Sequence, residues 1–410
     1  MIFRDSYLKK ILPFINTELI KILTGVRRSG KSVMLKLIQK HLLDSGVNFK
    51  QFIEINFEQL QFEALLDYHQ LNNYLVEKIE HKNYPKVYLF LDEIQEVRQF
   101  EKVINSLRAT YITKIDIYIT GSNAKLLSGE LATLLAGRYI HFDIYPFKFS
   151  EYLTAKKEQG ITENSQNLFN QYIIDGGMPF LTNQDLLPEQ RDNYLSDIYN
   201  SIVLKDIVQR NEIRETDLLQ RIYKFVIGNV GRIFSSQSVV KFLKNEGIST
   251  STNTVNNYIN AGIDAYFFIP ARRFNLQGKH LMKSQEKYYI VDHGLRQAVI
   301  GRNEQDIELI LENIVLMELK VRGYNVTVGK ANDSEVDFIA TKSIDNRIDK
   351  LYIQVSYLLA SKNTRKREFQ TLEKISDNYK KLVLTMDSFT SDQNGIEHHN
   401  LVDWLLQLAA

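Results

Sequence analysis

The feature that most constrains this chain is an eight-residue loop near its N-terminus. Gly25 and Gly30 are separated by four residues, and Lys31 and Ser32 follow directly. An apolar strand is predicted for residues 19–24, immediately before the loop, and a helix is predicted to open at Lys31. Glycines allow backbone N–H groups to curl around an anion, and the N-terminus of a helix adds its dipole. The spacing therefore predicts an α/β domain with a phosphate-binding loop at the end of one strand.

The residues of this loop have different expected roles in binding the polyphosphate of ATP. Lys31 is predicted to reach the β- and γ-phosphates, and the hydroxyl of Ser32 is predicted to ligate magnesium. Arg27 and Arg28 are expected to face solvent or a partner. The predicted ATP-binding residues are Gly25, Val26, Arg27, Arg28, Ser29, Gly30, Lys31 and Ser32. A chance match in a structural turn is the alternative, which the strand–loop–helix setting disfavours.

An acidic pair strengthens this interpretation. Residues 87–91 form a fully apolar strand that runs into Asp92 and Glu93. A carboxylate at the end of such a strand can hold the magnesium shell, which is the role predicted for Asp92. Glu93 is predicted to polarise the attacking water as a general base. With the loop, the pair predicts magnesium-dependent hydrolysis of ATP; two solvated turn acids are the alternative.

Two further residues are candidates for catalysis. Asn123, with Ser122 as the alternative, follows a strand predicted for 115–120. It can act as a sensor that hydrogen-bonds the attacking water or the γ-phosphate, although turn chemistry explains the same residues. Arg138, after a helix predicted for 124–135, is a candidate arginine finger for ATP bound to a neighbouring subunit. That role requires a homo-oligomer, and the alternative is a solvated arginine at a helix end.

The rest of the first region alternates strands and helices. Further strands are predicted for 51–57 and 139–145, and a helix is predicted for 95–111. Alternation of this kind implies a mostly parallel sheet covered on both faces. The predicted domains are an ATPase domain (1–148), a helical linker or lid (149–215), a winged helix-turn-helix (216–300) and a C-terminal domain (301–410).

The region 216–300 has the pattern of a winged helix. Ser236 is predicted to cap a helix over 237–245, and Thr252 to cap a third helix that ends near Asp264. That third helix would read the major groove of DNA. Its amide-rich face and the basic turn that follows supply the nucleic-acid candidates: Asn253, Asn256, Asn257, Asn260, Arg272, Arg273, Lys279 and Lys283.

Positive charge is concentrated in this region. The whole chain has 51 Lys and Arg against 49 Asp and Glu. Between residues 216 and 300 there are 11 Lys and Arg against 5 Asp and Glu, an excess of six. Phosphate contacts require such an excess, so DNA is the predicted partner. The alternative is a winged helix used for packing between subunits.

Composition narrows the other possibilities. The chain has no cysteine, which excludes disulfides, cysteine-ligated metal centres and thiol catalysis. The first ten residues alternate charged and apolar positions and lack the apolar core of a signal peptide. The apolar runs are too short to cross a bilayer. The expected location is the cytoplasm, with no membrane partner.

These residues resemble the AAA-type branch of P-loop ATPases. The chain is similar to a family of uncharacterised bacterial ATPases with a winged-helix middle and a nuclease-like C-terminal domain of unknown function. The resemblance implies a sheet of strand order 5-1-4-3-2, with Asp92 and Glu93 on the strand next to the one that precedes the P-loop. The motifs that carry it are at 25–32, 91–95, 120–123, 137–138, 176–179, 289–292 and 335–338.

The same resemblance implies a C-terminal α/β domain with the PD-(D/E)xK fold of restriction endonucleases. That chemistry needs carboxylates that hold a divalent metal and a lysine that assists the attacking water. The corresponding positions are Glu312, Asp337 and Gln354, and Ser356 stands where the lysine is expected. A glutamine carbonyl ligates magnesium more weakly than a carboxylate, and serine carries no charge. Nuclease activity is therefore predicted to be lost.

Three functions remain open from the sequence. The first is an ATPase that couples ATP turnover to conformational change on DNA. The second is a signalling switch in which nucleotide state controls a protein partner. The third is a metal-dependent nuclease gated by ATP. A complete hydrolytic site joined to a basic winged helix favours the first.

Overall fold

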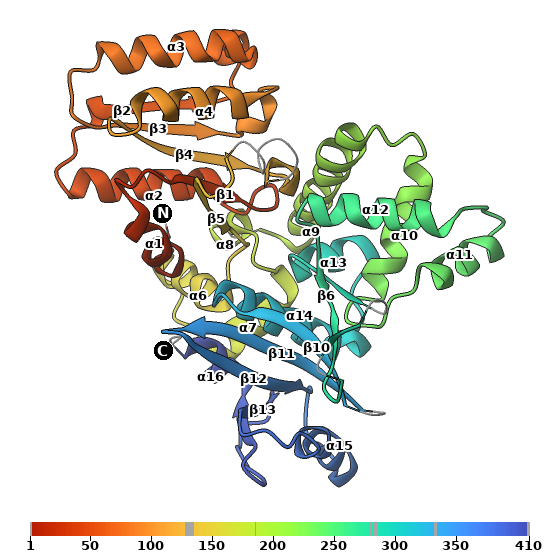
Figure 1. Ribbon diagram of the computed structural model, residues 1–410. Coiled ribbons are helices and arrows are strands. Elements are labelled where there is room, and N and C mark those ends of the chain that lie inside the picture. Colours follow the sequence, from red (N-terminus) through yellow and green to blue (C-terminus); the bar gives the residue numbers. More distant parts are fainter. Residues whose placement is uncertain are drawn as a thin grey trace. The chain divides into compact units, whose positions relative to one another are not determined.

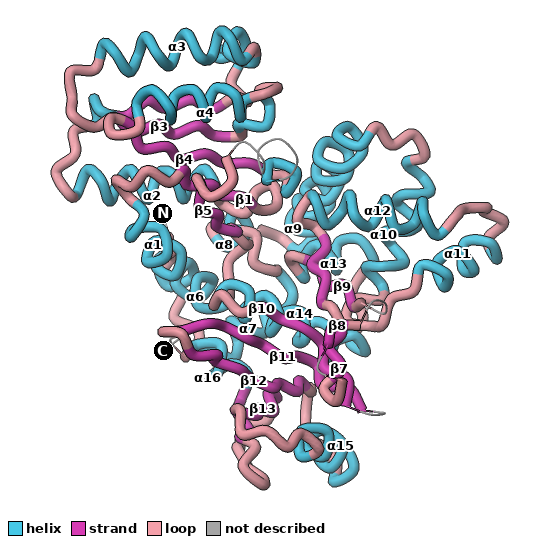
Figure 2. Tube along the Cα trace, viewed as in Figure 1, coloured by secondary structure: helices cyan, strands magenta, loops and turns pink. Residues whose placement is uncertain are grey.

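The computed structural model describes residues 2–127, 135–184, 186–278, 280–282, 286–331 and 334–407. The chain forms two compact units. The first comprises Met1–Tyr145 together with Asp264–Tyr266, and the second comprises Pro146–Ile263 and Phe267–Ala410. Figure 1 and Figure 2 show that each unit contains a β-sheet with helices packed against it.

The first unit contains a five-stranded parallel sheet. Its strands are β1 (Ile20–Thr24), β2 (Phe52–Asn56), β3 (Val87–Asp92), β4 (Ile115–Gly121) and β5 (Tyr139–Asp143). The order is β2-β3-β4-β1-β5, and every neighbouring pair is parallel. Read from the other edge this is 5-1-4-3-2, the order that the family resemblance implies. β1, β3 and β4 are buried along their whole length, which explains why they are mostly apolar. The charged residues of β1 and β4, Lys21 and Asp116, form a buried ion pair.

The position of the acidic pair differs from the prediction. β3, which ends at Asp92, does not pair with β1, because β4 lies between them and pairs with both. The prediction that Asp92 and Glu93 lie on the strand next to the P-loop strand was therefore wrong. It also conflicted with the order 5-1-4-3-2, which itself puts strand 4 between strands 1 and 3. Side chains of β4 can consequently take part in the site.

Helices cover both faces of this sheet. α3 (Tyr68–His81) and α4 (Phe100–Tyr111) share one hydrophobic core with the strands, and α2 (Lys31–Asp44) lies on the opposite face (Figure 1). A short helix, α1 (Asp5–Ile11), precedes the sheet. The P-loop follows the carboxyl end of β1, and the acidic pair lies at the carboxyl end of β3.

One helix predicted in this unit is shorter than expected, and another lies mostly outside the described residues. The pattern over 95–111 contains a 3-10 turn at Ile94–Glu96 and then α4, because Gln99 has a left-handed backbone (φ 60°) that interrupts the helix. Of the helix predicted for 124–135, the structure describes a 3-10 turn at Ala124–Leu127. Residues 128–134 lie outside the described part of the chain.

Helices dominate the first half of the second unit. They are α6 (Phe149–Glu158), α7 (Ser165–Asp175), α8 (Pro179–Thr182), α9 (Pro188–Ser201), a π-helical segment (Ile202–Gln209), α10 (Thr216–Gly228), α11 (Ser236–Asn245) and α12 (Thr252–Asp264). Ser235 and Ser251, rather than Ser236 and Thr252, cap α11 and α12 by accepting bonds from the N–H groups three residues ahead. Adjacent Ser and Thr residues qualify equally by type, so the sequence placed each cap one residue too late.

The turn predicted as a wing is part of a larger sheet. β6 (Phe268–Ala271) and β9 (Lys287–Ile290) pair with each other, whereas β7 (Arg273–Asn275) and β8 (His280–Leu281), which lie between them in sequence, join a seven-stranded sheet. β7 pairs with β10, whose edge would otherwise present unpaired backbone groups. The basic turn is therefore not a projecting wing. Lys279 and Lys283 lie outside the described residues.

The seven-stranded sheet forms the core of the C-terminal region. Its order is β14-β13-β12-β11-β10-β7-β8. α15 (Lys362–Glu373) packs Phe369 and Leu372 onto one face. The other elements are α13 (His293–Ile300), α14 (Ile307–Val321), β10 (Asn325–Ala331), β11 (Ser334–Ile344), β12 (Arg347–Val355), β13 (Lys380–Thr385), β14 (Glu397–Asn400) and α16 (Leu401–Leu406). Within the described residues, no helix combines the length and the apolar character that crossing a membrane requires.

Candidate functional site

The loop between β1 and α2 is shaped to surround an anion. Gly25, Arg28 and Gly30 have positive φ angles of 149°, 68° and 99°, which is typical of loops that gather N–H groups around an anion. A Cβ on Gly25 would lie 2.1 Å from the carbonyl oxygen of Ile144, so only glycine fits there. The hydroxyl of Ser29 is buried and has no hydrogen-bond partner among the described residues. The loop therefore fits a polyphosphate that accepts bonds from it.

Lys31 connects the loop to the acidic pair. Its ammonium donates to the carbonyl oxygens of Gly25 and Val26, at 3.2 and 3.3 Å. It also lies 3.4 Å from the carboxylate of Glu93. The lysine is buried. The amine is thus held within the loop by groups that a phosphate can replace as its partners.

The acidic pair is fixed by a hydroxyl from the strand between β1 and β3. The Thr120 hydroxyl donates to Oδ1 of Asp92 at 2.5 Å and accepts a bond from the backbone N–H of Glu93 at 2.9 Å. The Asn56 amide donates to Oδ2 of Asp92 at 3.1 Å. The hydroxyl of Ser32, at the start of α2, also bonds to Asp92. The two residues predicted to hold magnesium, Ser32 and Asp92, are therefore in contact.

The two carboxylates have pKa values displaced in opposite directions. Burial raises the pKa of Asp92, and the hydrogen bonds from Thr120 and Ser32 oppose this effect. Burial acts in the same sense on Glu93, but the charge of Lys31 and the hydrogen bond from Gln95 outweigh it, so the pKa of Glu93 is lowered. Glu93 also has a left-handed backbone (φ 55°), a conformation that carries strain and is common at active sites.

A pocket opens beside the predicted magnesium ligands. It has a volume of about 370 Å³ and lies between α2 and β2. Ser32 and Asp92 line it, together with Lys36, Glu54 and Asn56 among others. The candidate metal ligands are therefore accessible.

An arginine from the N-terminal segment supports the P-loop. Arg4 is buried, and its guanidinium donates to the carbonyl oxygens of Ser29 at 3.1 Å and Tyr145 at 2.8 Å. Its Cζ lies 4.5 Å from the centre of the Tyr7 ring. Arg4 thus ties a carbonyl of the P-loop to the segment that follows β5.

Thr24, the residue before the loop, bonds to a segment that is remote in sequence. The Tyr266 hydroxyl donates to Oγ1 of Thr24 at 2.6 Å, and Nε2 of His141 lies 2.6 Å from the same oxygen. Tyr266 belongs to the first unit and has a left-handed backbone (φ 57°). The short segment Asp264–Tyr266 therefore contributes to the base of the P-loop.

The predicted sensor lies at the carboxyl ends of the strands, and the predicted finger lies at their amino ends. Asn123 is buried and follows the carboxyl end of β4, the strand that pairs with β1. Arg138 precedes β5, whose first residue pairs with Ile20 at the amino end of β1. Its guanidinium donates to Asn105 of α4 at 2.9 Å. Because the P-loop follows the other end of β1, Arg138 cannot act on ATP bound to its own chain.

The two arginines of the loop differ in their surroundings. Arg28 is exposed, as predicted. Arg27 instead forms an ion pair with Glu58 at 2.9 Å, and its side chain is 13% exposed. Arg27 is therefore partly exposed beside a carboxylate from the segment after β2, and a contact of Arg27 with a partner stays a prediction.

The nucleic-acid candidates on α12 share an exposed face. Asn253, Asn256, Asn257 and Asn260 are all exposed, and Asn256 accepts a hydrogen bond from the hydroxyl of Ser236. The helix buries Val255 and Ile259 on its other side. The amide stripe predicted from helical spacing is therefore present on the surface.

The two basic candidates of the predicted wing that the structure describes are each paired with an acid. Arg272 is exposed and lies 3.4 Å from Glu286. Arg273 is buried, and its guanidinium lies 3.3 Å from Glu335. Arg273 was therefore wrongly assigned to phosphate binding, because β7 joins the seven-stranded sheet and turns this side chain toward an acid of β11.

Several other basic residues of the region 216–300 are also paired. Arg221 contacts Asp217 and Glu246, and Arg296 contacts Asp306. Asp217 and Glu246 are already subtracted in the excess of six, whereas Asp306 and Glu335, the partners of Arg296 and Arg273, lie outside the region. These two pairs mean that the excess counted from the sequence overstates the positive charge available to a phosphate. Besides Arg221, the exposed basic residues on or beside the three helices are Lys224, Arg232, Lys241 and Lys244.

Structure brings the three nuclease-like positions together. β11 has one extra residue relative to β10 between Val336 and Ile339, a bulge that re-aims Asp337. Asp337 accepts the Val355 N–H at 2.8 Å, and its own N–H donates to the Gln354 amide oxygen at 3.4 Å. Burial raises the pKa of Glu312, on α14, to about 7, and burial and the charge of Glu312 raise that of Asp337.

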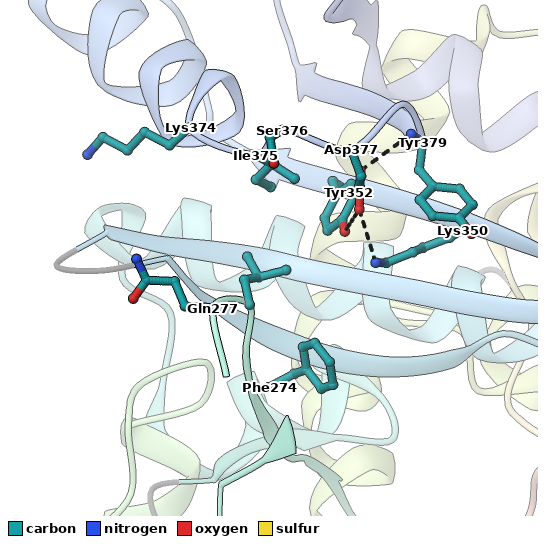
Figure 3. Close-up of a pocket in the computed structure, with 10 residues that line it drawn as sticks. Phe274, Gln277, Lys350, Tyr352, Lys374, Ile375, Ser376, Asp377 and Tyr379 are labelled. Carbon is teal, nitrogen blue, oxygen red and sulfur yellow. Dashed lines mark hydrogen bonds and ion pairs between the residues drawn. The ribbon is translucent and has the colours of Figure 1, made fainter. Parts of the chain in front are cut away.

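A separate pocket lies in the second unit. It has a volume of about 870 Å³, and Figure 3 shows side chains of β7 and β12 and of the segment after α15 around it. Asp377 accepts bonds from the Tyr352 hydroxyl and from Lys350 (Figure 3). Lys350 and Asp377 are thus paired with each other, and Lys374 donates to the hydroxyl of Ser334. The residues that line the pocket include neither a glycine-rich loop nor an acidic pair at a strand end.

Sequence reasoning missed the residues that hold the site in shape. Thr120 belongs to the motif at 120–123, but its role could not be predicted. Its bonds to Asp92 and Glu93 form only because β4 lies beside β3. Asn56, Gln95, Arg4 and Tyr266 follow no motif spacing. A polar residue at the carboxyl end of a buried strand was the signal that could have identified Thr120.

Comparison with known proteins agrees with this architecture. Residues 17–153 match an AAA domain family, and residues 166–306 match a domain of unknown function (DUF8612). An uncharacterized protein of Haemophilus influenzae is 38% identical over 408 residues, covering 99% of both chains. An uncharacterized protein of Methanocaldococcus jannaschii is 31% identical over 393 residues, covering 92% of this chain and 83% of that protein.

Solved structures are more distant. The Walker-type ATPase of Pyrococcus abyssi has a TM-score of 0.46 at 13% identity and covers 73% of this chain and 96% of that one. This likeness is too weak to add to what the sheet and the loop show. The identities and coverage of the two relatives are high enough to define a family. The chain belongs to the family of these two uncharacterized proteins, and its residues 17–153 form an AAA-type P-loop ATPase domain.

Proposed function

We propose that this protein hydrolyses ATP at the P-loop, with magnesium held by Ser32 and Asp92. The observation that carries the proposal is the contact network that joins the loop to the acidic pair. Lys31 lies 3.4 Å from Glu93, and Ser32 bonds to Asp92. When bound, magnesium would neutralise charge on the β- and γ-phosphates.

The side chains divide the work of hydrolysis. Lys31 exchanges its bonds to the carbonyls of Gly25 and Val26 for bonds to phosphate oxygens, which removes its charge from beside Glu93. Glu93 then accepts a proton from the attacking water. Thr120 holds the Glu93 backbone and the Asp92 carboxylate in a fixed relation. The residues thus act mainly by positioning and by charge, as phosphoryl transfer requires.

Two further roles belong to the same proposal. Asn123, at the carboxyl end of β4, senses the γ-phosphate or the attacking water. Arg138 acts as an arginine finger on ATP bound to a neighbouring copy of the chain. It lies at the amino ends of the strands, away from the P-loop of its own chain. This second role implies a homo-oligomer.

The nucleotide cycle is proposed to drive a conformational change on DNA. The support is the exposed amide stripe of α12, because amides can hydrogen-bond base edges and phosphates. Exposed lysines on α10 and α11 supply positive charge in the same region, which we interpret as a three-helix DNA-binding module without a projecting wing. The paired arginines reduce that charge, so binding is expected to be strongest at low salt.

Hydrolysis is tested with Glu93→Gln, which keeps the shape of the side chain and removes its basicity. The variant should bind ATP as the wild type does and release phosphate at least about 100-fold more slowly, the range of a lost general base. The matched control is Glu96→Gln, an exposed glutamate three residues further on. Near-normal turnover by Glu93→Gln would remove Glu93 from the mechanism.

Coupling is tested by measuring ATP turnover with and without DNA at several salt concentrations. DNA should stimulate the wild type at low salt. Asn257→Asp with Asn260→Asp places two negative charges on the α12 face and should weaken DNA binding about tenfold or more. Asn167→Asp, on the surface of α7, is the control. If DNA changes neither turnover nor affinity at low salt, the coupling proposal is wrong.

A further inference from the structure

The C-terminal centre contains a lysine that the sequence motif lacks. Lys287 comes from β9, far from the position of Ser356 in sequence, and is buried. Its ammonium lies 2.6 Å from Oε1 of Glu335 and 3.8 Å from Oε2 of Glu312. The nuclease-like carboxylates therefore already face a cation that belongs to the chain itself.

The oxygens that would ligate a metal have other partners. Oδ2 of Asp337 accepts the backbone N–H of Val355, and Oε2 of Glu312 accepts the hydroxyl of Tyr289 at 3.1 Å. Gln354 carries an amide where a second carboxylate is expected. Among the described residues, no group of three or more His, Asp or Glu side chains is arranged to hold a metal ion. With Lys287 in place, the centre therefore does not fit a divalent cation.

The negative charge of the cluster is balanced by basic side chains of the same chain. Glu312, Glu335 and Asp337 supply the acidic groups, and Lys287 and Arg273 supply the basic ones. Arg273 lies 3.3 Å from Glu335, so the same glutamate is shared by both cations. Without Lys287, Glu312 would lose the basic partner that the structure places beside it. A buried carboxylate without a cation is strongly unfavourable.

We propose that the Lys287 ammonium is a built-in substitute for the divalent cation of this nuclease-like centre. The centre is then a buried ion-pair network that holds β9, β11 and α14 together without metal. It performs no metal-dependent cleavage. This proposal is independent of the P-loop, since it concerns residues of the second unit.

Manganese is the probe for this proposal. The experiment starts from the 410-residue chain with Asp92→Asn and no nucleotide. This substitution removes the acid that is predicted to hold metal at the P-loop. Mn²⁺ should not raise the melting temperature of this chain. The spectroscopic signal of free Mn²⁺ should also stay unchanged when the chain is added. Lys287→Ala in the same background should melt at a lower temperature, and Mn²⁺ should restore part of the loss. Adding Asp337→Asn should abolish that restoration.

The matched control is Lys350→Ala, which removes another lysine paired with an acid, Asp377 at 3.3 Å. Mn²⁺ should not restore the stability of this variant. The proposal is overturned if Mn²⁺ stabilises the chain that retains Lys287 and Asp337→Asn removes the effect, because the metal and the lysine would then be present together. Failure of Mn²⁺ to restore a folded Lys287→Ala chain also overturns it. If Lys287→Ala does not fold, the titration of the chain with Lys287 intact decides the question alone.

Discussion

Replacing Thr120 by valine removes one buried hydroxyl and leaves the side-chain shape almost unchanged. That hydroxyl donates to Asp92 and accepts from the N–H of Glu93, and Thr120 is fully buried. The substitution therefore leaves a buried N–H without its partner, at a cost of about 1–3 kcal/mol. It also removes a hydrogen bond to a charged group, which contributes about 1.5–3 kcal/mol. Because the two bonds share one atom and neighbours relax, we expect a combined loss of about 2–4 kcal/mol.

The stability loss can be measured by thermal and urea unfolding. For a unit of this size the loss corresponds to a fall in Tm of roughly 5–15 °C. Thr120→Val should also slow ATP turnover, because the acidic pair loses its support. The control is Thr120→Ser, which keeps the hydroxyl and should recover most of that turnover. A general packing defect would not be corrected by serine. A Thr120→Val chain with the Tm and the ATP turnover of the wild type would refute the assignment of Thr120 as the positioning residue of the acidic pair.

The same substitution has a pH signature. The bond from Thr120 lowers the pKa of Asp92, which burial raises above its ordinary value. Its removal should raise that pKa further, so the acid limb of the kcat/KM profile should move to higher pH. Because the folded state holds this proton more tightly than the unfolded chain does, Asp92 lowers stability above its folded pKa. That cost is relieved as the pH falls through the folded pKa.

Two other variants test the supports of the site. Arg4→Lys keeps the charge but cannot bridge the carbonyls of Ser29 and Tyr145; we expect a higher KM for ATP with a smaller change in kcat, measured by steady-state kinetics, and an unchanged KM would show that Arg4 does not shape the loop. Lys21→Met leaves the buried Asp116 without its ion-pair partner in β1; we expect a loss of about 3–5 kcal/mol in urea unfolding, and a loss below about 1 kcal/mol would show that the pair is not a stability determinant.

Much of the first unit follows from its sequence because local rules and chemistry agree there. The strand before Asp92 is a continuous apolar run, and the strand before the loop is apolar apart from Lys21 and Thr24. The loop between Gly25 and Gly30 has the spacing that phosphate binding requires. These features locate the ends of β1 and β3. They do not say which strand lies between the two, since strand order depends on packing between elements that are distant in sequence.

The middle and C-terminal parts were less predictable for the same reason. The turn that contains Arg273 has the composition of an exposed basic loop, yet β7 pairs with β10, more than fifty residues further along the chain. The role proposed for Lys287 depends on that arrangement too, because its acidic partners come from α14 and β11. Exposure of Asn257 and Asn260, by contrast, follows from helical spacing alone, and the structure has it.

The most direct test of the central claim is the affinity of the protein for ATP, measured by calorimetry on the wild type and on Lys31→Ala in the presence of magnesium. We predict that the wild type binds ATP with a stoichiometry of about one per chain, as a single cradle requires, and that Lys31→Ala binds it far more weakly while retaining its fold by circular dichroism. Equal affinity in the two folded proteins would mean that the loop between β1 and α2 is not the nucleotide site.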